Sequence, residues 1–467
     1  LSTAREIITL WVSRMVMFNR YFLDGQLPYD DVFIHAMVQD GHGQKMSKSL
    51  GNGVDPRDII HGHGADAMRF ALVQMTTDTQ DVRMPVDLVC PFTGEEFEPE
   101  TLVTPAGHVV AAPIQKSPAG DGREMVSAYG VAVGAAEPTD ERPLARNSSP
   151  KFDLGRNFAN KLWNATRFAL RRLDDTETVA APVLLSEARF VDQWIMARLA
   201  ETIDTLEDAM ARYQFNVVAD TLYDFVWRDV CDRYLEAIKP TVDDDPDQQV
   251  VLGVVLDTVL RLMHPVFPFV TEALWPAVSA AQRGTVAGVA APPSELLAAA
   301  GWPAVEPEAV DRGVIGEFAR ADALVAMVRS LRAQHNVKPK QHVTLHVSAP
   351  IRELIDRSGG VVETLAGVGS VVDLDDGRPA VASPLAFEGA EVLVSDLVDE
   401  VDLDAERARL SKVVEAKTKQ VDGFEGRLAN EGYLKNAKPE LVAETRELLA
   451  AARADLDAAK AALAALT

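Results

Sequence analysis

The sequence has few cysteines and no long apolar run, and each shortage excludes a class of protein. Among its 467 residues only two are cysteine, Cys90 and Cys231. Two thiols are too few for a four-cysteine metal site or a disulfide scaffold, so we expect no metal site and a reducing cytoplasm. No apolar run approaches the roughly 18 residues of a membrane-spanning helix, so we expect no contact with a membrane.

Positive charge is also scarce. Lysine and arginine number 46 against 70 aspartates and glutamates, which gives a formal net charge of -24. Taken alone, this excess argues against binding to nucleic acid, because phosphate contacts need lysine and arginine. An acidic chain can still concentrate positive charge on one face, however, so local clusters matter more than the sum.

One short segment concentrates lysine, hydroxyl groups and glycine. Residues 43–52 read GQKMSKSLGN, and we call residues 41–53 the lysine loop. Lysine ammonium groups bind phosphate oxygens as point charges, glycines let backbone amides approach an anion, and serine hydroxyls add donors. A solvated basic loop is the ordinary alternative. The composition favours a polyphosphate site.

The patterns around the lysine loop predict an α/β fold. Apolar residues recur at helical spacing over residues 5–22, which predicts a core-facing helix. The apolar run at 32–38 predicts a buried parallel strand, and the lysine loop follows its carboxyl end, where open α/β sheets bind ligands. Asp55 and Pro56 predict the start of a helix, and residues 65–75 predict another.

Four motifs occur in one order along the chain, namely Trp11-Val12-Ser13-Arg14-Met15, His35 before Gln39-Asp40-Gly41, the lysine loop, and Gly64-Ala65-Asp66-Ala67-Met68-Arg69-Phe70. This order and spacing resemble the class Ia aminoacyl-tRNA synthetases, the group that includes the valyl, isoleucyl and leucyl enzymes. The valyl members are the most similar. The resemblance implies that residues 1–85 are the later part of a Rossmann-type catalytic domain together with its stem.

The resemblance also implies roles for individual residues. Lys45 and Lys48 would be catalytic, stabilising the pyrophosphate leaving group during adenylate formation. ATP with Mg²⁺ would be a substrate, with no tightly bound cofactor. Trp11 would form a wall of the amino-acid pocket, although a core tryptophan on a helix is the alternative. Glu6 occupies a position where the family usually has aspartate. The implied ATP-binding set is Glu6, His35, Lys45, Met46, Ser47, Lys48 and Ser49.

Residues 86–150 change in character. They are rich in Pro, Gly, Thr and Val, with short strand-like runs between turns, and we interpret them as a β-rich insertion of unknown function. The run Cys90-Pro91-Phe92-Thr93-Gly94 is similar to half of a zinc knuckle. A single sulfur without a partner pair argues against zinc, however.

Residues 151–340 return to helical periodicity and predict a helical bundle. Lys161, Phe168 and Arg172 share one helix face, with Arg167 beside it. Cations next to an aromatic ring suit single-stranded RNA, and a solvated basic face is the alternative. The resemblance implies an anticodon-binding domain in which Lys161, Arg167 and Phe168 face the anticodon. The helices expected after residue 173 span 194–213, 215–239, 250–276 and 317–334.

The last part of the chain predicts two smaller structures. Residues 341–398 alternate strand-like runs with a short helix at 350–357, which indicates a small α/β subdomain. Residues 399–467 contain two heptad runs with a break between them, which predict an antiparallel coiled-coil hairpin. A dimerisation coil is one interpretation, and the valyl resemblance implies an arm that binds tRNA. The basic residues near its tip are Arg427, Lys435 and Lys438.

The sequence therefore predicts a multidomain α/β plus all-α protein. The chain begins without methionine inside an amphipathic pattern and lacks the His-x-Gly-His element and the editing domain of the family. We expect the C-terminal portion of an enzyme that ligates valine to tRNA(Val) with ATP, a cytoplasmic monomer, inactive as this fragment alone. A non-catalytic tRNA-binding fragment or module and an isoleucyl-type synthetase are the alternatives.

Overall fold

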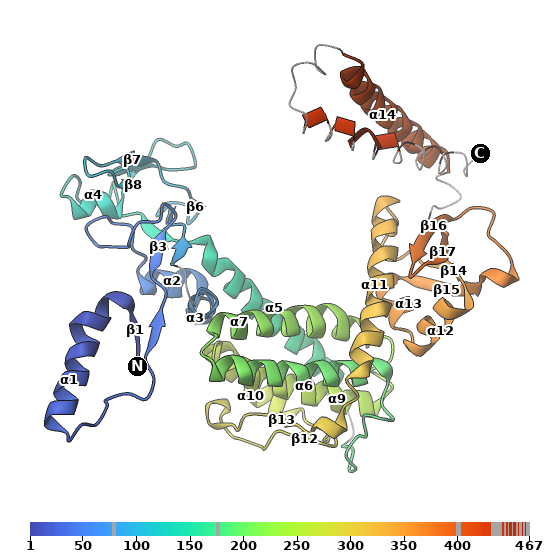
Figure 1. Ribbon diagram of the computed structural model, residues 1–467, viewed down its shortest axis with the longest axis horizontal. Helices are drawn as coiled ribbons and strands as arrows, with labels where there is room; N and C mark the ends of the chain where they lie inside the picture. The colour runs from blue at the N-terminus through green and yellow to red at the C-terminus, as the bar shows by residue number, and fades with distance from the viewer. Residues whose placement is uncertain are drawn as a thin grey trace. The chain divides into compact units, whose positions relative to one another are not determined.

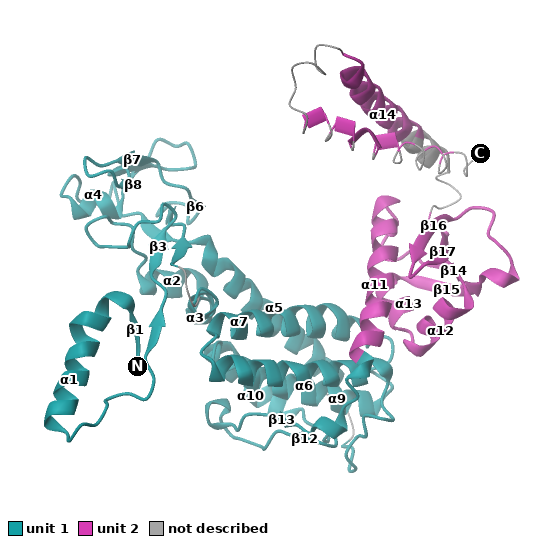
Figure 2. Cartoon of the chain, viewed as in Figure 1, with its two compact units in different colours: residues 1–314 teal, residues 315–467 magenta. Residues whose placement is uncertain are grey.

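The computed structural model describes residues 1–76, 81–173, 178–397 and 403–430, together with separate helical positions between 441 and 463. These residues form two compact units, 1–314 and 315–467 (Figure 2). Among the described residues, no helix is both long enough and apolar enough to cross a membrane.

Unit 1 begins with a helical segment whose apolar side lies on the surface. The 3-10 turn η1 (Arg5–Ile7) leads into the π-helical η2 (Ile8–Val12) and then α1 (Ser13–Phe22) (Figure 1). The predicted helix is confirmed, but its core-facing character is wrong, because only Val12 is buried. Helical periodicity specifies an apolar face without specifying what covers it.

The apolar run after α1 forms two strands instead of one. β2 (Phe33–His35) pairs in parallel with β1 (Ser2–Ala4), and β3 (Val38–Asp40) pairs in parallel with β4 (Val82–Met84). Parallel pairing is confirmed, whereas a single buried strand is wrong. The carboxylate of Asp81 lies at the break, where it accepts hydrogen bonds from the Met37 amide, the Gln39 side chain and both terminal nitrogens of Arg5.

The two helices after the lysine loop begin at the predicted residues, and the second ends one residue before its predicted end. α2 (Pro56–His63) begins after Asp55, whose carboxylate accepts a 2.8 Å hydrogen bond from the Arg57 amide as an N-cap. Gly64, with φ of +92°, separates α2 from α3 (Ala65–Gln74).

Seven short strands and one helix follow. β5 (Asp87–Val89) is the central strand of a three-stranded sheet with β6 (Glu96–Phe97) and β11 (Arg146–Ser148). Leu88, Cys90, Met125 and Ala145 form a small core beneath it. The Cys90 thiol is buried 3.9 Å from the Ser117 hydroxyl, and no group of three metal-ligating side chains occurs in the part of the chain that is described. The remaining elements are β7 (Thr101–Val103), β8 (Val109–Ala111), β9 (Ile114–Lys116), β10 (Glu124–Val126) and α4 (Ala128–Ala132).

A helical bundle completes unit 1. Phe70 of α3, Phe158 of α5 and Phe267 pack ring against ring at its centre, with centroids 5.2–5.6 Å apart. The single helix predicted over 250–276 is wrong, because the chain turns at 264–267, where Pro265 and Pro268 supply no amide hydrogen. The elements are η3 (Pro150–Phe152), α5 (Asp153–Leu173), α6 (Phe190–Ala211), α7 (Phe215–Tyr223), π-helical η4 (Asp224–Tyr234), α8 (Leu235–Ala237), α9 (Pro246–Met263), α10 (Pro268–Ala280), β12 (Val289–Ala290), η5 (Leu297–Ala299), β13 (Ala304–Val305) and η6 (Pro307–Ala309).

Unit 2 contains a four-stranded mixed sheet in the order β15-β14-β17-β16. The helix α11 (Gly313–Gln334) carries the chain into this unit. Arg329 and Arg332 of α11 donate to the backbone oxygens of Leu365 and Gly367, so they join α11 to the segment at 365–367. The elements are β14 (Val343–Val347), α12 (Ala349–Arg357), α13 (Val361–Ala366), β15 (Val368–Asp373), η7 (Leu374–Asp376), β16 (Ser383–Phe387) and β17 (Ala390–Ser395).

Two helical runs at the end of the chain pack against each other through the predicted heptad positions. The first is α14 (Leu403–Ala429), and the second includes the helical positions between 441 and 463 (Figure 1). Arg453 and Glu425 form an ion pair of 2.6 Å across the two runs. Their shared core consists of Val414, Val421, Phe424, Leu449, Ala452 and Leu456.

Candidate functional site

The lysine loop is folded around one buried carboxylate, that of Asp40 at the end of β3. Asp40 accepts hydrogen bonds from the His42 amide at 3.0 Å, from the amide and side chain of Gln44 at 2.9 and 2.8 Å, and from the Asn52 side chain at 2.7 Å. Burial raises the pKa of Asp40, but these hydrogen bonds more than offset it and hold the pKa below its usual value. The ionised Asp40 carboxylate therefore holds the two ends of the loop together, because its donors come from His42 and Gln44 at one end and from Asn52 at the other.

Two further contacts fix the middle of the loop. The Ser47 amide donates to the side-chain oxygen of Asn52 at 2.9 Å, and the Leu50 amide donates to the Ser47 hydroxyl at 3.2 Å. Met46 packs against an apolar core that includes Ile59. With Met46 directed inward, Lys45 and Lys48 on either side of it are exposed.

The two lysines differ in their partners. The Lys45 ammonium group donates to the Glu6 carboxylate at 2.7 Å, and this hydrogen bond lowers the pKa of Glu6. Among the described residues, no hydrogen bond or ion pair engages Lys48. The structure thus brings Glu6 and Lys45 together and leaves Lys48 available to an anion.

The other residues predicted for this site lie near the loop or on the surface. The Ser47 and Ser49 hydroxyls are 3.1 Å apart, and the exposed His35 ring is 3.0 Å from the Ala36 oxygen. Trp11 is 60% exposed, so the alternative of a core tryptophan is wrong.

The basic face predicted for RNA lies on α5. The Phe168 ring is half-buried between two cations, with Arg172 5.2 Å and Lys239 5.5 Å from its centroid. Lys161 lies 3.9 Å from the centroid of Trp227 and donates to Asp232 at 2.5 Å. We call Lys161, Arg167, Phe168, Arg172 and Lys239 the Phe168 patch.

Carboxylates accompany the cations of the Phe168 patch. Asp232 pairs with Lys161, Asp243 with Arg172, and Glu236 with Lys239. Arg167 is exposed, and no ion pair engages it among the residues that the structure describes. The patch therefore presents an aromatic ring among cations whose present partners an incoming phosphate would have to replace.

Cys231 and His264 both belong to the packed interior of the bundle. Cys231 is buried, which raises the pKa of its thiol to about 12. His264 is largely buried, with a ring nitrogen 2.9 Å from the Thr271 hydroxyl. At the tip of the last two helical runs, Arg427 is exposed, whereas Lys435 and Lys438 lie outside the described residues.

Two residues that join the lysine-loop region to the bundle were not identified from the sequence. Asp66 accepts hydrogen bonds from the Phe269 and Val270 amides at 3.1 and 2.7 Å, capping α10. Arg69 donates to the Pro265 oxygen at 2.8 Å. Both belong to a motif quoted above, but nothing local to α3 indicates partners about 200 residues away.

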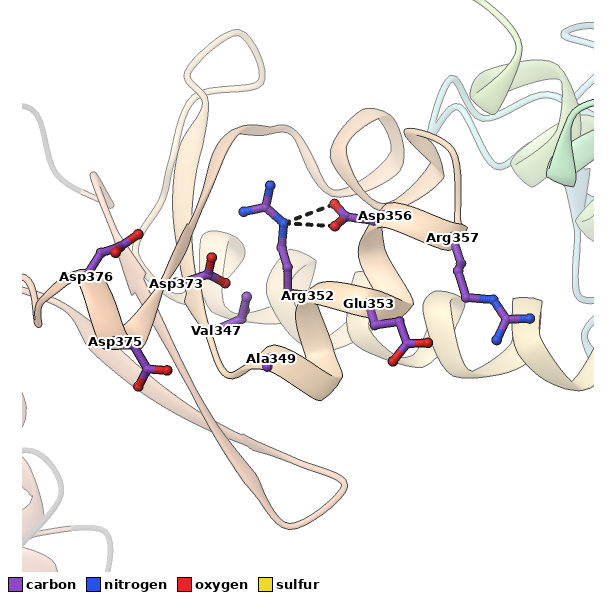
Figure 3. Close-up of a pocket in the computed structure, with 9 residues that line it drawn as sticks. All are labelled: Val347, Ala349, Arg352, Glu353, Asp356, Arg357, Asp373, Asp375 and Asp376. Atoms are coloured by element: carbon purple, nitrogen blue, oxygen red, sulfur yellow. Dashed lines mark hydrogen bonds and ion pairs between the residues drawn. The ribbon is translucent and has the colours of Figure 1, made fainter.

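A cavity of about 630 Å³ in unit 2 is a poor site for phosphate. Figure 3 shows Arg352 directed at Asp356, at 3.0 Å, and Arg357 is engaged by Glu317. The remaining charged groups at its rim are acidic, namely Glu353, Asp373, Asp375 and Asp376. Because like charges repel, neither ATP nor RNA suits this cavity.

Comparison with known families gives three matches in order along the chain. Residues 1–85 match the tRNA synthetases class I (I, L, M and V). Residues 192–348 match the anticodon-binding domain of tRNA ligase, and residues 402–467 match the valyl tRNA synthetase tRNA binding arm. The chain belongs to the class I aminoacyl-tRNA synthetases.

Within that class, the relatives are valine–tRNA ligases. The protein of this name from Rhodopirellula baltica is 36% identical over 98% of this chain and 44% of its own length. Those from Thermotoga maritima and Bacillus subtilis are 33% and 31% identical over 96% of this chain, and 42% and 43% of their own lengths. The chain thus spans less than half the length of these relatives.

Proposed function

We propose that the chain supplies the ATP-phosphate loop and the tRNA-binding parts of an enzyme that ligates valine to tRNA(Val) through a valyl-adenylate. The observation that carries this proposal is the lysine loop, whose internal hydrogen bonds fix its backbone while Lys45 and Lys48 stay exposed. Similarity to valine–tRNA ligases over 96–100% of the chain supports the choice of amino acid and tRNA.

The proposed chemistry is charge stabilisation at a leaving group. When the valine carboxylate attacks the α-phosphate of ATP, negative charge accumulates on the departing pyrophosphate. Lys48 would contact these oxygens first, and Lys45 would follow by exchanging Glu6 for phosphate. Groups placed before the reaction stabilise developing charge effectively, because they need not reorganise. Mg²⁺ enters with ATP as part of the substrate and neutralises further phosphate charge.

The remaining site residues have supporting parts in this proposal. Ser47, Ser49 and His35 would offer hydrogen-bond donors to the nucleotide, and Met46 would anchor the loop. Trp11 belongs to an exposed apolar surface that includes Met17, Phe18 and Tyr21. Surfaces of this kind mark interaction sites. We propose that the rest of the catalytic domain covers this surface in the whole enzyme, with Trp11 forming a wall of the valine pocket.

The tRNA would contact two parts of the chain. Phe168 would stack on an anticodon base, while Lys161 and Arg167 would meet phosphates or base edges. Arg427 would meet the tRNA backbone from the paired helices at the end of the chain, and Lys435 and Lys438 would meet it as well. The matches to an anticodon-binding domain and to a tRNA binding arm support both assignments.

The proposed division of the chain follows these roles. It comprises a Rossmann-type catalytic part with stem (1–85), a β-rich insertion (86–150), an anticodon-binding domain (151–340), a small α/β subdomain (341–398) and a coiled-coil arm (399–467). We further propose a cytoplasmic monomer. The two free, buried cysteines fit a reducing compartment.

Two assays on the 467-residue chain test the proposal. We expect the chain to bind tRNA(Val) in a filter-binding titration and to show no valine-dependent ATP–pyrophosphate exchange. An intact valine–tRNA ligase serves as the positive control for exchange. Failure to bind tRNA(Val), or exchange at the rate of the intact enzyme, would contradict the proposal.

A further inference from the structure

The strand-rich segment after the lysine loop holds that loop from outside. Gln44 of the loop pairs with the backbone of β8 in both directions, since its side-chain nitrogen donates to the Val109 oxygen at 2.6 Å and its oxygen accepts from the Val109 amide at 2.8 Å. A residue in a β-sheet makes the same pair of hydrogen bonds, one donated and one accepted, with a neighbouring strand. Here the amide side chain of Gln44 makes both. It ties the first half of the loop to a residue 65 positions away.

A second contact holds the other half of the loop. The side-chain nitrogen of Asn147, on β11, donates to the Gly51 oxygen at 2.8 Å and to the Gly53 oxygen at 2.7 Å. Asn147 is only 7% exposed, so these hydrogen bonds are shielded from water. Losing a buried donor here would leave two carbonyl groups unsatisfied.

The third contact is a close approach of two backbones. Gly51 has a φ of +58°, and a Cβ atom built on it would lie 2.2 Å from the Tyr129 nitrogen at the start of α4. The loop can therefore approach α4 only because residue 51 is glycine. Between these contacts a cavity of about 440 Å³ remains, with Leu50 and Asn52 on one side and Glu98 and Val110 on the other. The segment thus braces the loop at separate points.

The bracing elements are connected to one another. The buried Gln115 accepts from the Glu100 amide at 2.9 Å and donates to the Glu100 and Ala112 oxygens. The Ser127 hydroxyl caps α4 by accepting from the Gly130 amide. The Gln115 side chain, on β9, therefore links the residue before β7 to the residue after β8.

We propose that residues 86–150 are a clamp that holds the lysine loop in one conformation before nucleotide binds, with Asn147 and Gln44 as its positioning residues. Ordering a loop costs backbone entropy, so a loop ordered in advance binds its ligand more tightly. The benefit to ATP rests on the function proposed above, whereas the clamping itself does not.

Hydrogen exchange of the lysine loop in the 467-residue chain tests the clamp. Asn147→Asp keeps the shape of residue 147 but places a carboxylate against two carbonyl oxygens. We expect exchange of the amides over 41–53 to increase about tenfold, because local opening becomes easier. Asn157→Asp, an identical change at an exposed position of α5, is the control and should leave this exchange unchanged.

Two outcomes would overturn the clamp. One is unchanged loop exchange in Asn147→Asp. The second arises when Asn147→Asp also accelerates exchange in the buried helix α9, because unit 1 has then unfolded and the variant no longer reports on the loop alone. Gln44→Met then becomes the deciding variant, and unchanged loop exchange in that variant would overturn the clamp.

A parallel measurement separates the clamp from the function. Magnesium tripolyphosphate added to the unaltered chain should slow exchange at 41–53 further, and Asn147→Asp should weaken its binding about tenfold while leaving tRNA binding unchanged. If tripolyphosphate gives no protection, the loop is not a polyphosphate site. The clamp would still stand on the exchange of Asn147→Asp alone.

Discussion

The lysine loop and the helical bundle each contain a buried carboxylate, and the two carboxylates differ in charge. Asp40 in the loop accepts four hydrogen bonds, which hold its pKa below the usual value. Asp192 in the bundle accepts only two, from the Tyr234 hydroxyl at 2.7 Å and the Gln248 side chain at 2.8 Å, and burial raises its pKa to about 7. Deeper burial with fewer donors raises the pKa of Asp192, whereas the four donors around Asp40 outweigh the cost of its burial.

The two regions also hold their surface cations differently. In the lysine loop, neutral amide groups and Asp40 fix the backbone, so Lys48 needs no carboxylate partner to be positioned. In the Phe168 patch, acidic side chains accompany Lys161, Arg172 and Lys239. A chain with a net charge of -24 thus keeps Lys48 available at the loop, and it pairs three of the four cations of the patch, all but Arg167, with carboxylates.

The largest effect should come from removing the charge of the loop carboxylate. We expect Asp40→Asn to lower the free energy of unfolding of unit 1 by about 2–3 kcal/mol, because charge-assisted hydrogen bonds are lost and donors face a new donor. Urea denaturation followed by tryptophan fluorescence measures this, since all six tryptophans lie in unit 1. Asp140→Asn, at an exposed position, is the control. A loss below about 0.5 kcal/mol would contradict this expectation, because substitutions of ordinary surface residues have effects of that size.

A smaller effect should follow the protonation of Asp192. Its pKa is about 7 in the folded chain and near its ordinary value in the unfolded chain, so the folded state binds the proton more tightly. The stabilisation is therefore present at low pH and is lost as pH rises through about 7. We expect the unfolding free energy to fall by about 1 kcal/mol more between pH 6 and pH 8 in the unaltered chain than in Asp192→Asn.

The difference between these two proteins isolates Asp192, because other titrating groups are common to both. Chemical denaturation at several pH values measures the unfolding free energy of the unaltered chain and of Asp192→Asn. Equal pH dependence in the two proteins would show that Asp192 is ionised in the fold, like Asp40.

The smallest effect should come from the ion pair at the loop surface. We expect Glu6→Gln to raise the affinity for magnesium tripolyphosphate slightly, because Lys45 no longer needs to leave a carboxylate, and exposed ion pairs contribute little. Isothermal titration calorimetry measures this affinity, with Glu141→Gln, at an exposed position, as a control. Weaker binding by Glu6→Gln would indicate that Glu6 positions Lys45 instead of competing for it.

Local signals in the sequence predicted the local structure well. Asp55 and Pro56 mark the start of α2, because an N-cap and a first-turn proline act within one turn. The wrong predictions concern contacts between residues that are far apart in the sequence. The strand at 32–38 is divided because Asp81 and β4 bind its second half, and no periodicity reports a partner more than 40 residues away. At 264–268 two prolines interrupt the helix although the apolar pattern continues across them.

The candidate site was predictable only in part for the same reason. Lys45 and Lys48 could be selected because a polyphosphate site needs lysine, glycine and serine close together in sequence. The residues that shape the loop could not be selected. Asp40, Asn52 and Asn147 are ordinary polar residues until the fold brings them together, and the exposed face of α1 depends on what covers it.

The assignment of RNA binding to the bundle and of nucleotide binding to the loop predicts different effects of two single variants, Phe168→Ala and Lys48→Ala, on tRNA(Val) binding by the 467-residue chain. We predict that Phe168→Ala weakens binding about thirtyfold, the effect of losing one stacked base, whereas Lys48→Ala changes it by less than about twofold. This result would place the RNA-binding site on the helical bundle and would be consistent with the lysine loop as the nucleotide-binding site. Equal losses in the two variants would contradict the account.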